Sequence, residues 1–494
     1  MGITYDAIIV GGGLAGLSCA AILAKNGKRI ILFEKNNIVG GRCSSYKKKG
    51  FIIDYGTHVF TRTEFGPIGV LLSEINESVE FYHLRRMPFY YLRKEGKVGP
   101  FGIDIDTKYG SILPPDEEFK KLNFDKEDFK DLLNKLSKTT NMELEETYKY
   151  DNIPFFDWYE KNKEVLNIGE GVKGLLFSLY SSGLCLLVEE GSTGEFMRIM
   201  KNNSSSSIHS MLKKEVRALG LGYPKGACIA VPNAIERAIN KFGGKIIKNT
   251  IIDEIILEDG EVKGVITDKG ETYQSKIVIS NIGPKETIIA AGKQNFQKKF
   301  LSKIDSLKES VRGYVLKVAL DEPVTDEAFL FGLASNIEKS SLIMKEARLP
   351  EIPWTIFVPV VSNMDPSLAP KGKQLMIPAH GTYGDTVKYP WHKLSEKILE
   401  SLEIIFPHIQ NKISFYDEFG AVQAKTLWKA NDGAIIRVAQ IPGQVGEDAL
   451  PSKTPIKGLY LVGTGIGTGI SEIGVDYAIR SGSECAKDIL KNEK

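Results

Sequence analysis

Three glycines near the start of the sequence, Gly11, Gly13 and Gly16, have the G-x-G-x-x-G spacing that can hold the pyrophosphate of a dinucleotide. The first glycine allows a tight turn, the second lets the backbone approach the phosphates, and the third lets a helix pack closely on a strand. About twenty residues further on, Glu34 ends an apolar run, where a carboxylate can accept hydrogen bonds from the hydroxyls of an adenosine ribose. These residue types at this spacing predict a dinucleotide site rather than a glycine-rich turn without a ligand.

The elements that must position these glycines are a strand, a helix and a second strand. The short apolar stretch 5–10 predicts a buried parallel strand, and the apolar side of residues 14–25 predicts a helix. Residues 29–33 predict the second strand of this βαβ unit. Because the helix begins at Leu14 and Ala15, its free N–H groups and its dipole would stabilise the charge of a phosphate there.

A second glycine-rich stretch follows this unit and decides between dinucleotides. Gly41 permits another close approach of the backbone, and Arg42 offers a fork of donors suited to a diphosphate. The short strand GFIID then leads to Gly56, Thr57 and His58. A plain nicotinamide-binding fold has no such second crossing, so these residues favour FAD over NAD.

The motifs GGGLAGL, FEK, GGR and DYGTH resemble those of the flavin amine oxidase superfamily, and within it those of the phytoene desaturase-like branch. Residues 223–255 are similar to the family's second FAD-domain segment, and residues 362–374 to a loop common in the phytoene desaturase-like branch. Residues 458–482 resemble the closing flavin motif. The resemblance implies an α/β fold, with a glutathione-reductase-type FAD-binding Rossmann domain interleaved with an α+β substrate domain built on a mixed or antiparallel sheet.

The closing motif also has a physical interpretation of its own. Residues 458–462 predict a strand and residues 474–490 a helix, whose start can face the flavin and stabilise negative charge on the reduced ring. The family usually has an acid after the strand glycine, where this sequence has Thr464, whose hydroxyl can still hydrogen-bond the ribityl chain or the pyrophosphate. The glycines after Gly463 do not repeat the dinucleotide spacing, so no separate NAD(P) domain is predicted.

The motifs and the resemblance together predict one set of FAD-binding residues. They are Gly11, Gly13, Leu14, Ala15, Gly16, Glu34, Lys35, Gly41, Arg42, Gly56, Thr57, His58, Ile252, Gly463, Thr464, Ile473, Gly474 and Val475. The flavin carries the redox step, so the protein has to place a carbon–hydrogen bond near the ring and exclude water. No catalytic triad and no metal site is predicted, and His58 is the one histidine inside a cofactor motif, where it could orient the flavin, meet the substrate or make a structural hydrogen bond. Asp54 is interpreted as a turn residue rather than a base.

The order of the motifs predicts a cofactor domain made from three parts of the chain. These are residues 1–75, 215–290 and 440–494, and the intervening residues 76–214 and 291–439 would form the substrate domain. The chain has 494 residues, which is long enough for two or more cores. Strand patterns such as YVLKVALD and WTIFVPVV fit the predicted sheet of the substrate domain, whereas NNSSSS predicts a flexible loop.

The composition sets limits on partners and compartment. The 64 basic and 62 acidic residues nearly cancel, which gives no reason to expect nucleic acid as a partner. The five cysteines contain no C-x-x-C pair, and the N-terminus has no basic leader, so a cytoplasmic protein with free thiols is expected. No apolar stretch reaches the length of a membrane span. The number of subunits is left open.

The segment 173–190, KGLLFSLYSSGLCLLVEE, has two interpretations. It predicts either a buried pair of helices broken near Gly183, or the apolar wall of a substrate tunnel that could open at a membrane surface. Likewise, residues 47–49 are three lysines that are either solvated or in contact with anionic lipid. An apolar small-molecule substrate with peripheral membrane contact is therefore one expectation.

Three functions stay open on the sequence. The first is a phytoene desaturase-like FAD oxidoreductase that desaturates, saturates or isomerises carbon–carbon bonds of an apolar isoprenoid or polyene such as a carotenoid. The second is another flavin oxidase, acting on an amine or a porphyrinogen, which would need an aromatic cage for the amine and often a lysine near the flavin. The third is a non-catalytic prenyl-lipid-binding protein of the same fold, which would predict degraded FAD motifs. The intact motifs favour an enzyme, and we expect the first function.

Overall fold

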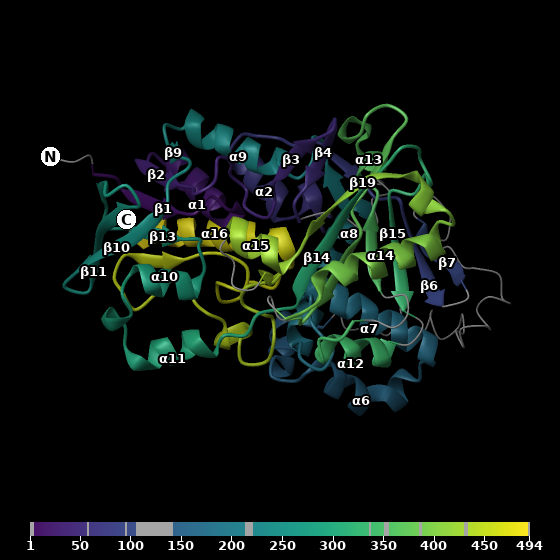
Figure 1. The fold of residues 1–494 in the computed structure, drawn as a ribbon. Helices are drawn as coiled ribbons and strands as arrows, with labels where there is room; N and C mark the ends of the chain where they lie inside the picture. Colours follow the sequence, from purple (N-terminus) through teal and green to yellow (C-terminus); the bar gives the residue numbers. More distant parts are fainter. Residues whose placement is uncertain are drawn as a thin grey trace.

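A five-stranded parallel sheet brings both ends of the chain together (Figure 1). The structure is a computed structural model that describes residues 4–56, 59–93, 96–104, 142–212, 221–334, 337–349, 355–384, 388–428 and 433–492. The sheet has the order β20–β13–β1–β2–β9. Its strands are β1 (Ala7–Val10), β2 (Ile30–Phe33), β9 (Lys245–Ile247), β13 (Val278–Ser280) and β20 (Leu459–Leu461).

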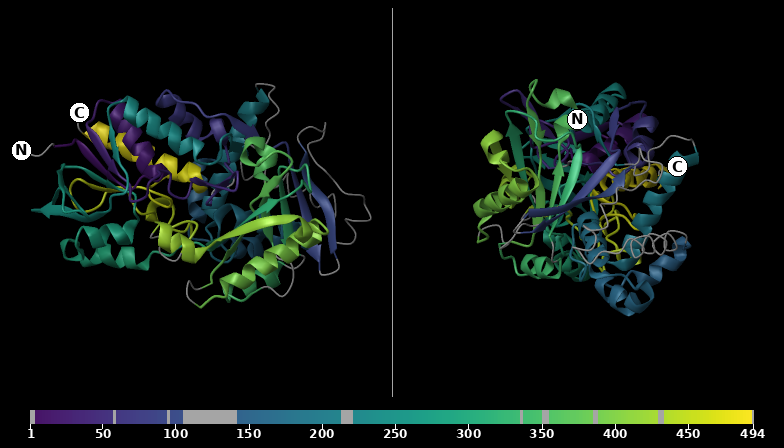
Figure 2. Two further views of the ribbon diagram at one scale, coloured as in Figure 1. Left: turned by 45° about the horizontal axis from the view of Figure 1, so that its top comes forward. Right: turned by 90° about the vertical axis from the view of Figure 1, so that its right-hand side faces the viewer.

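The two faces of this sheet belong to two separate cores, because neighbouring side chains of a strand point to opposite sides. Ile9 packs with the helices α1 (Leu14–Lys25), α9 (Ala230–Lys241) and α16 (Gly474–Asn492). Ile8 and Val10 pack instead against the antiparallel strands β10 (Ile252–Glu258), β11 (Glu261–Thr267) and β12 (Thr272–Gln274). In both views of Figure 2 the purple α1 and the yellow α16 lie side by side.

Helix α1 begins and ends where its sequence predicts. Gly13 is its N-cap residue, and no side chain caps its first turn. The helix ends at Lys25, and Gly27 follows with a φ of 79°, a left-handed conformation that glycine adopts without strain. Eleven of its twelve residues are buried, so tertiary packing on α9 and α16 stabilises it from several sides.

The second large sheet is mixed and has eight strands. Its order is β17–β14–β18–β16–β15–β6–β7, with β19 paired to β14. Its strands are β6 (Arg86–Arg93), β7 (Gly96–Asp104), β14 (Arg312–Leu320), β15 (Phe329–Ala334), β16 (Ile356–Pro359), β17 (Gln374–Met376), β18 (Ala379–Thr382) and β19 (Ile413–Phe419). The pair β15–β6 is parallel and the other pairs are antiparallel. The predicted α/β fold with a mixed sheet is confirmed. The strands of the two sheets fall within the segments predicted for the two domains, whose boundaries stay a prediction.

Two expectations about helices are wrong. The stretch 202–207 is not a loop, because helix α8 (Thr193–Leu212) runs through it. Serine lowers helix stability only modestly, and Glu195 and Arg198 at the start of α8 are buried, so tertiary contacts outweigh the local preference. The segment 173–190 contains one helix rather than two, since α7 (Glu170–Leu184) passes through Gly183 and ends before a left-handed Cys185.

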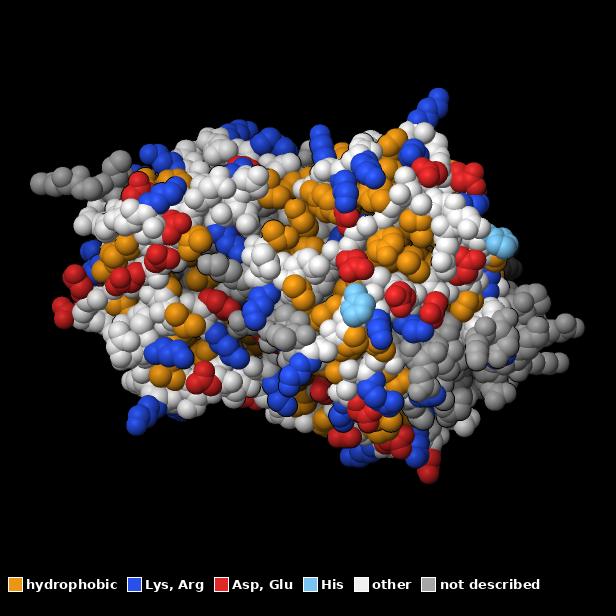
Figure 3. All heavy atoms as spheres, in the orientation of Figure 1, with side chains coloured by type: hydrophobic (Ala, Val, Ile, Leu, Met, Phe, Trp, Pro, Cys, Tyr) orange, Lys and Arg blue, Asp and Glu red, His pale blue; other side chains and the backbone are white. Residues whose placement is uncertain are grey.

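The surface carries charges of both signs side by side, as the face in Figure 3 shows. Of the three lysines at 47–49, Lys48 pairs with Asp417, and the ammonium groups of Lys48 and Lys49 lie 5.1 and 5.0 Å from the centre of the Phe415 ring. These contacts tie two of the lysines to the protein's own surface. Within the described part of the chain, no helix has both the length and the hydropathy that a bilayer span requires.

Candidate functional site

A cavity of about 1140 Å³ runs from the glycine motifs into the space beside the mixed sheet. Fifteen of the eighteen predicted FAD-binding residues line it. They are Gly11, Gly13, Leu14, Ala15, Glu34, Lys35, Gly41, Arg42, Gly56, Ile252, Gly463, Thr464, Ile473, Gly474 and Val475. Thr57 and His58 lie outside the described residues. Gly16 does not line the cavity, because it is buried against the backbone of the preceding turn.

The glycines of the first motif leave no room for larger residues. A Cβ atom on Gly16 would lie 2.2 Å from the carbonyl oxygen of Gly11, so this glycine permits the close packing of helix on strand. A Cβ atom on Gly13 would lie 2.6 Å from the Oδ1 atom of Asn281. The second glycine-rich stretch passes directly beside the first, since the Gly40 N–H donates to the carbonyl of Gly12 at 2.7 Å. Backbone atoms of both glycine-rich stretches therefore face the cavity beside the start of α1, which no side chain caps.

Glu34 sits at the end of β2 and is almost fully buried. Its Oε2 atom accepts a hydrogen bond from the Gly12 N–H at 2.8 Å, and its Oε1 atom accepts one from the Asn36 N–H at 2.9 Å. Burial raises the pKa of this carboxyl, against the lowering effect of these two hydrogen bonds. Each oxygen keeps a lone pair for a further donor, which is what a ribose hydroxyl would supply.

Asn281 joins the motifs of the two chain ends, and the sequence prediction missed it. Its Oδ1 atom accepts from the Gly16 N–H at 3.2 Å, and its Nδ2 atom donates to the carbonyl of Val462 at 2.9 Å. It follows β13, between β1 and β20 in the sheet. A polar residue directly after a buried parallel strand is a signal that could have revealed it, because ligands of such sheets bind at the carboxyl ends of the strands.

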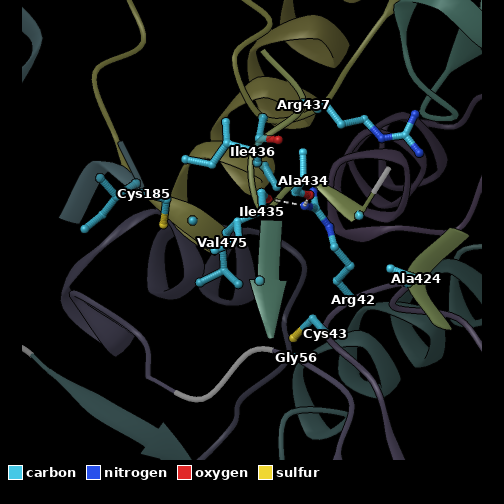
Figure 4. Close-up of a pocket in the computed structure, with 18 of the residues that line it drawn as sticks. Arg42, Cys43, Gly56, Cys185, Ala424, Ala434, Ile435, Ile436, Arg437 and Val475 are labelled. Atoms are coloured by element: carbon cyan, nitrogen blue, oxygen red, sulfur yellow. Dashed lines mark hydrogen bonds between the residues drawn. The ribbon is translucent and has the colours of Figure 1, made fainter. Parts of the chain in front are cut away.

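Arg42 reaches across the cavity to the segment before β20 (Figure 4). Its Nη1 atom donates to the carbonyl of Ala434 at 3.2 Å and also to that of Ile435. Burial and the positive charge of Arg437 lower the pKa of Arg42 to about 10, so the guanidinium keeps its charge at neutral pH. Arg437, which the sequence did not predict, also lines the cavity, where its Nη1 atom pairs with Glu286 at 3.1 Å.

The C-terminal motif closes the cavity from the side of α16. Gly463 and Gly474 have φ values of 146° and 53°, which non-glycine residues rarely adopt. Between them, the Oγ1 atom of Thr464 is buried and has no hydrogen-bond partner within the described structure. A buried hydroxyl without a partner costs free energy, so a ligand in the cavity that offers it a hydrogen bond would be stabilised there.

Beyond the glycine motifs the cavity continues into a part lined mainly by apolar side chains, here called the chamber. One wall is the face of the mixed sheet, and the opposite wall is formed by α7, α8 and the helix α12 (Ile337–Lys345). The apolar side chains of this chamber include Met87, Leu176, Phe177, Phe196, Ile199, Met200, Phe329, Phe331, Met344 and Phe357. The second interpretation of segment 173–190, an apolar wall, therefore agrees with the position of α7.

Comparison with known proteins decides the family. Residues 14–490 match the family described as flavin containing amine oxidoreductase. The chain belongs to this family. It is 24% identical over 517 residues to 4,4'-diaponeurosporene oxygenase of Staphylococcus aureus (strain bovine RF122 / ET3-1), which covers 99% of both chains. It is 25% identical over 528 residues to the chloroplastic prolycopene isomerase 2 of an Oncidium hybrid cultivar, covering 98% of this chain and 83% of that protein.

The fold is shared with solved structures as well. An oxidoreductase from Methanosarcina mazei superposes with a TM-score of 0.67 at 22% identity, covering 98% of this chain and 99% of the other. The resemblance to the flavin amine oxidase superfamily is thus confirmed, and with it FAD as cofactor and an oxidoreductase activity. The uncapped helix start, the bare glycine backbone and the unpartnered Thr464 hydroxyl all fit this cofactor.

Asp54 has a different role from the turn residue that we expected. It ends β4 (Phe51–Asp54) and is fully buried. It accepts hydrogen bonds from Ser45 Oγ at 2.6 Å, from the Cys228 N–H at 3.1 Å and from the Tyr223 hydroxyl. Burial raises the pKa of Asp54. This carboxyl therefore joins the first and second cofactor segments from within the core.

Lys317 is a further residue that sequence patterns did not single out. It lies on the same face of β14 as Gly313 and Val315, which line the cavity, and its side chain is buried. Its Nζ atom lies 4.4 Å from the centre of the Phe419 ring and has no hydrogen-bond partner within the described structure. Burial lowers the pKa of Lys317 to about 7.

No group of described His, Cys, Asp and Glu side chains has the arrangement of a metal site.

Proposed function

We propose that this FAD-dependent oxidoreductase acts on carbon–carbon bonds of an apolar isoprenoid or polyene, by desaturation, saturation or isomerisation. The observation that carries the proposal is the continuity of the cavity, which runs from the predicted cofactor residues into a chamber lined by phenylalanine and aliphatic side chains. A long hydrocarbon gains free energy by leaving water for such a chamber. The names of the two relatives, a diaponeurosporene oxygenase and a prolycopene isomerase, support a carotenoid-type substrate.

In this proposal bound FAD supplies the two-electron chemistry. The start of α1 and the glycine backbone bind its pyrophosphate, Glu34 accepts from its ribose, and Arg42 and Arg437 offset its negative charge. Thr464 donates to its ribityl chain or pyrophosphate. The phenylalanine rings of β15 and β16 orient the polyene and exclude water from the reacting carbons.

A second function, oxidation of an amine, is favoured by a specific observation. The ring centres of Tyr55, Phe419 and Trp428 lie 4.7 to 6.1 Å from one another, and Phe419 and Trp428 line the cavity. Lys317 lies against this cluster, with its Nζ atom 4.4 Å from the centre of the Phe419 ring. Aromatic faces attract a cation such as a substrate ammonium group. Here the ammonium of Lys317 already lies over the Phe419 ring, so this ring face is occupied by a cation of the protein itself.

Anaerobic titration of the purified flavoprotein separates the two functions. We expect the flavin absorbance to bleach when a carotenoid-type polyene is added in detergent, and to stay unchanged with aliphatic or aromatic amines. For a saturating or isomerising enzyme, the same experiment is run with chemically reduced flavin, and the polyene spectrum is followed. Turnover of amines without any turnover of polyenes would make the amine function the correct one.

A further inference from the structure

Two residues directly before α16, Ser471 and Glu472, are held by side chains of α8. The Nε atom of Arg198 donates to Ser471 Oγ at 2.8 Å, and this hydroxyl donates to Glu195 Oε2 at 2.9 Å. Asn202 Nδ2 donates to the Ser471 carbonyl at 2.7 Å. Helix α8 therefore forms hydrogen bonds with both the side chain and the backbone of Ser471, which stands three positions before Gly474.

Gln440 extends the same network to the next residue. Its Nε2 atom donates to Glu195 Oε1 at 2.6 Å and to the carbonyl of Glu472 at 2.9 Å. The carboxylate of Glu472 in turn pairs with Arg62, and its Oε1 atom accepts from Arg480 Nη1 at 3.0 Å. The hydroxyl and carbonyl of Ser471 and the carbonyl and carboxylate of Glu472 are thus all bonded to residues outside the bend.

The network is buried, which makes it costly unless its groups stay paired. Arg198 and Glu195 are each 1% exposed, and Arg198 also pairs with Asp151 at 2.6 Å. Desolvation of such charges offsets much of their attraction, so a buried ion pair is a weak source of stability. Other side chains of α8, Phe196, Ile199 and Met200, line the chamber. A single helix therefore contacts both the apolar chamber and the bend that precedes α16.

We propose that Arg198, Glu195 and Gln440 are positioning residues that fix the N-terminus of α16 against the flavin and so raise the reduction potential of the bound cofactor. The proposal rests on the placement of the flavin beside Ile473, Gly474 and Val475 that the proposed function assumes. The N-terminus of a helix stabilises negative charge within its first turn only, so a small displacement weakens its effect on the reduced ring. The network supplies no atom that reacts.

The test measures the reduction potential of the FAD-loaded protein without any substrate, against reference dyes under anaerobic conditions. Ser471→Ala deletes one hydroxyl and two contacts of the network, and leaves Arg198 paired with Asp151 and Glu195. The matched control is Ser395→Ala on the helix α14 (Trp391–Ile405), because Ser395 is also buried and its hydroxyl lies 2.6 Å from that of Tyr314. We expect the reduced-to-oxidised ratio to fall about tenfold in Ser471→Ala, which is about 30 mV for a two-electron couple, and to stay unchanged in the control.

A second variant, Gln440→Leu, acts on Glu472 instead of Ser471 and keeps the proposal testable if Ser471→Ala folds without FAD. It should move the potential in the same negative direction, whereas Ser471→Thr, which keeps the hydroxyl, should restore most of the value. Fully FAD-loaded Ser471→Ala and Gln440→Leu proteins with the potential of the unchanged chain would overturn the proposal. Since no substrate is added, this result is independent of whether polyenes or amines are turned over.

Discussion

The Oε2 atom of Glu34 accepts a hydrogen bond from the backbone N–H of Gly12 at 2.8 Å, which ties the end of β2 to the glycine turn after β1. The carboxylate thus holds the turn open for the cofactor and, in the proposed function, also accepts from the ribose. In the proposed function, one residue would therefore couple the shape of the glycine turn to recognition of the adenosine half of FAD. Comparing Glu34→Ala with Glu34→Gln tests how much of FAD binding depends on the carboxylate and how much on a single acceptor oxygen.

Glu34→Ala should weaken FAD binding by about tenfold to a hundredfold, because the Gly12 and Asn36 N–H groups lose a buried acceptor. Glu34→Gln keeps one carbonyl oxygen for Gly12 and should lose less affinity than Glu34→Ala. The measurement is a titration of apoprotein with FAD, followed by the quenching of flavin fluorescence. Equal affinity of the unchanged chain and Glu34→Ala would contradict this role.

Gly13→Ala should also weaken FAD binding, but through a clash. The added Cβ atom would lie 2.6 Å from Asn281 Oδ1, and Asn281 cannot move aside without losing its bonds to Gly16 and Val462. Overpacking of this kind costs about 1–3 kcal/mol, which is about tenfold or more in affinity. Gly183→Ala is the matched control, since no atom lies within 4 Å of its Cβ position, and it should bind FAD normally.

The glycine unit could be predicted closely because its signals are local. The turn residues, the apolar periodicity of α1 and the acid after β2 stand within one stretch of about thirty residues, as in other βαβ units. The C-terminal motif added Gly463, Thr464, Ile473, Gly474 and Val475 to the same cavity, since its glycines mark the loop and its apolar periodicity marks α16. These features depend on local backbone geometry, which glycine positions and apolar periodicity indicate directly in the sequence.

The polar residues that come from single strands were missed for a physical reason. Asn281, Lys317 and Arg437 each stand alone within or after an apolar stretch. Only tertiary packing brings Asn281 and Arg437 to the cavity and buries Lys317 on the strand face beside it. The network of Arg198 likewise joins α8 to a bend more than two hundred residues away in the chain. Contacts of this separation are set by tertiary packing, and the serine-rich stretch of α8 was mistaken for a loop for the same reason.

Lys317 should make the stability of the protein rise with pH between about 7 and 10.5. Its pKa is lowered to about 7 by burial, from an ordinary value of 10.5, so below pH 7 the folded state has to carry a buried charge. Between these two values the unfolded chain holds a proton that the folded chain has lost, so raising the pH favours the folded state. The cost below pH 7 is on the order of 5 kcal/mol.

The check is the difference in thermal stability between Lys317→Met and the unchanged chain as a function of pH. Methionine does not titrate, so its advantage should be greatest below pH 7 and disappear near pH 10.5. Lys371→Met, at an exposed lysine, is the matched control for the loss of one ammonium group. A pH-independent difference for Lys317→Met would mean that Lys317 keeps its charge across this range.

Ala379→Phe should block the chamber without affecting the cofactor. Ala379 lines the cavity on β18, opposite Phe357 of β16, so a benzyl group there would occupy the space proposed for the polyene. We expect unchanged FAD affinity and loss of the change in the flavin spectrum that a polyene causes. Val70→Phe, at a site that is 61% exposed, serves as the control. If Ala379→Phe still bound and turned over the polyene, the substrate would lie elsewhere.

Thr464→Val should separate the stability of the apoprotein from its affinity for FAD. In the apoprotein the Thr464 hydroxyl is buried without a partner, so replacing it with a methyl group of similar shape should leave the melting temperature unchanged or raise it. In the loaded protein the same change would remove the hydrogen bond that the proposed function assigns to Thr464 and the cofactor. We therefore expect FAD binding about tenfold weaker, from a bond of about 1 kcal/mol or somewhat more.

Thr464→Ser keeps the hydroxyl and should retain the affinity, so the comparison of Val with Ser isolates one oxygen atom. The two measurements are the melting temperature of the apoprotein and the FAD titration. A hydroxyl that only fills space in the fold would give the opposite pattern, with FAD affinity preserved in Thr464→Val. Loss of affinity in Thr464→Val and its retention in Thr464→Ser, together with a more stable Thr464→Val apoprotein, would indicate that the hydroxyl finds its partner in the bound cofactor. Threonine would then replace the acid that is usual at this position.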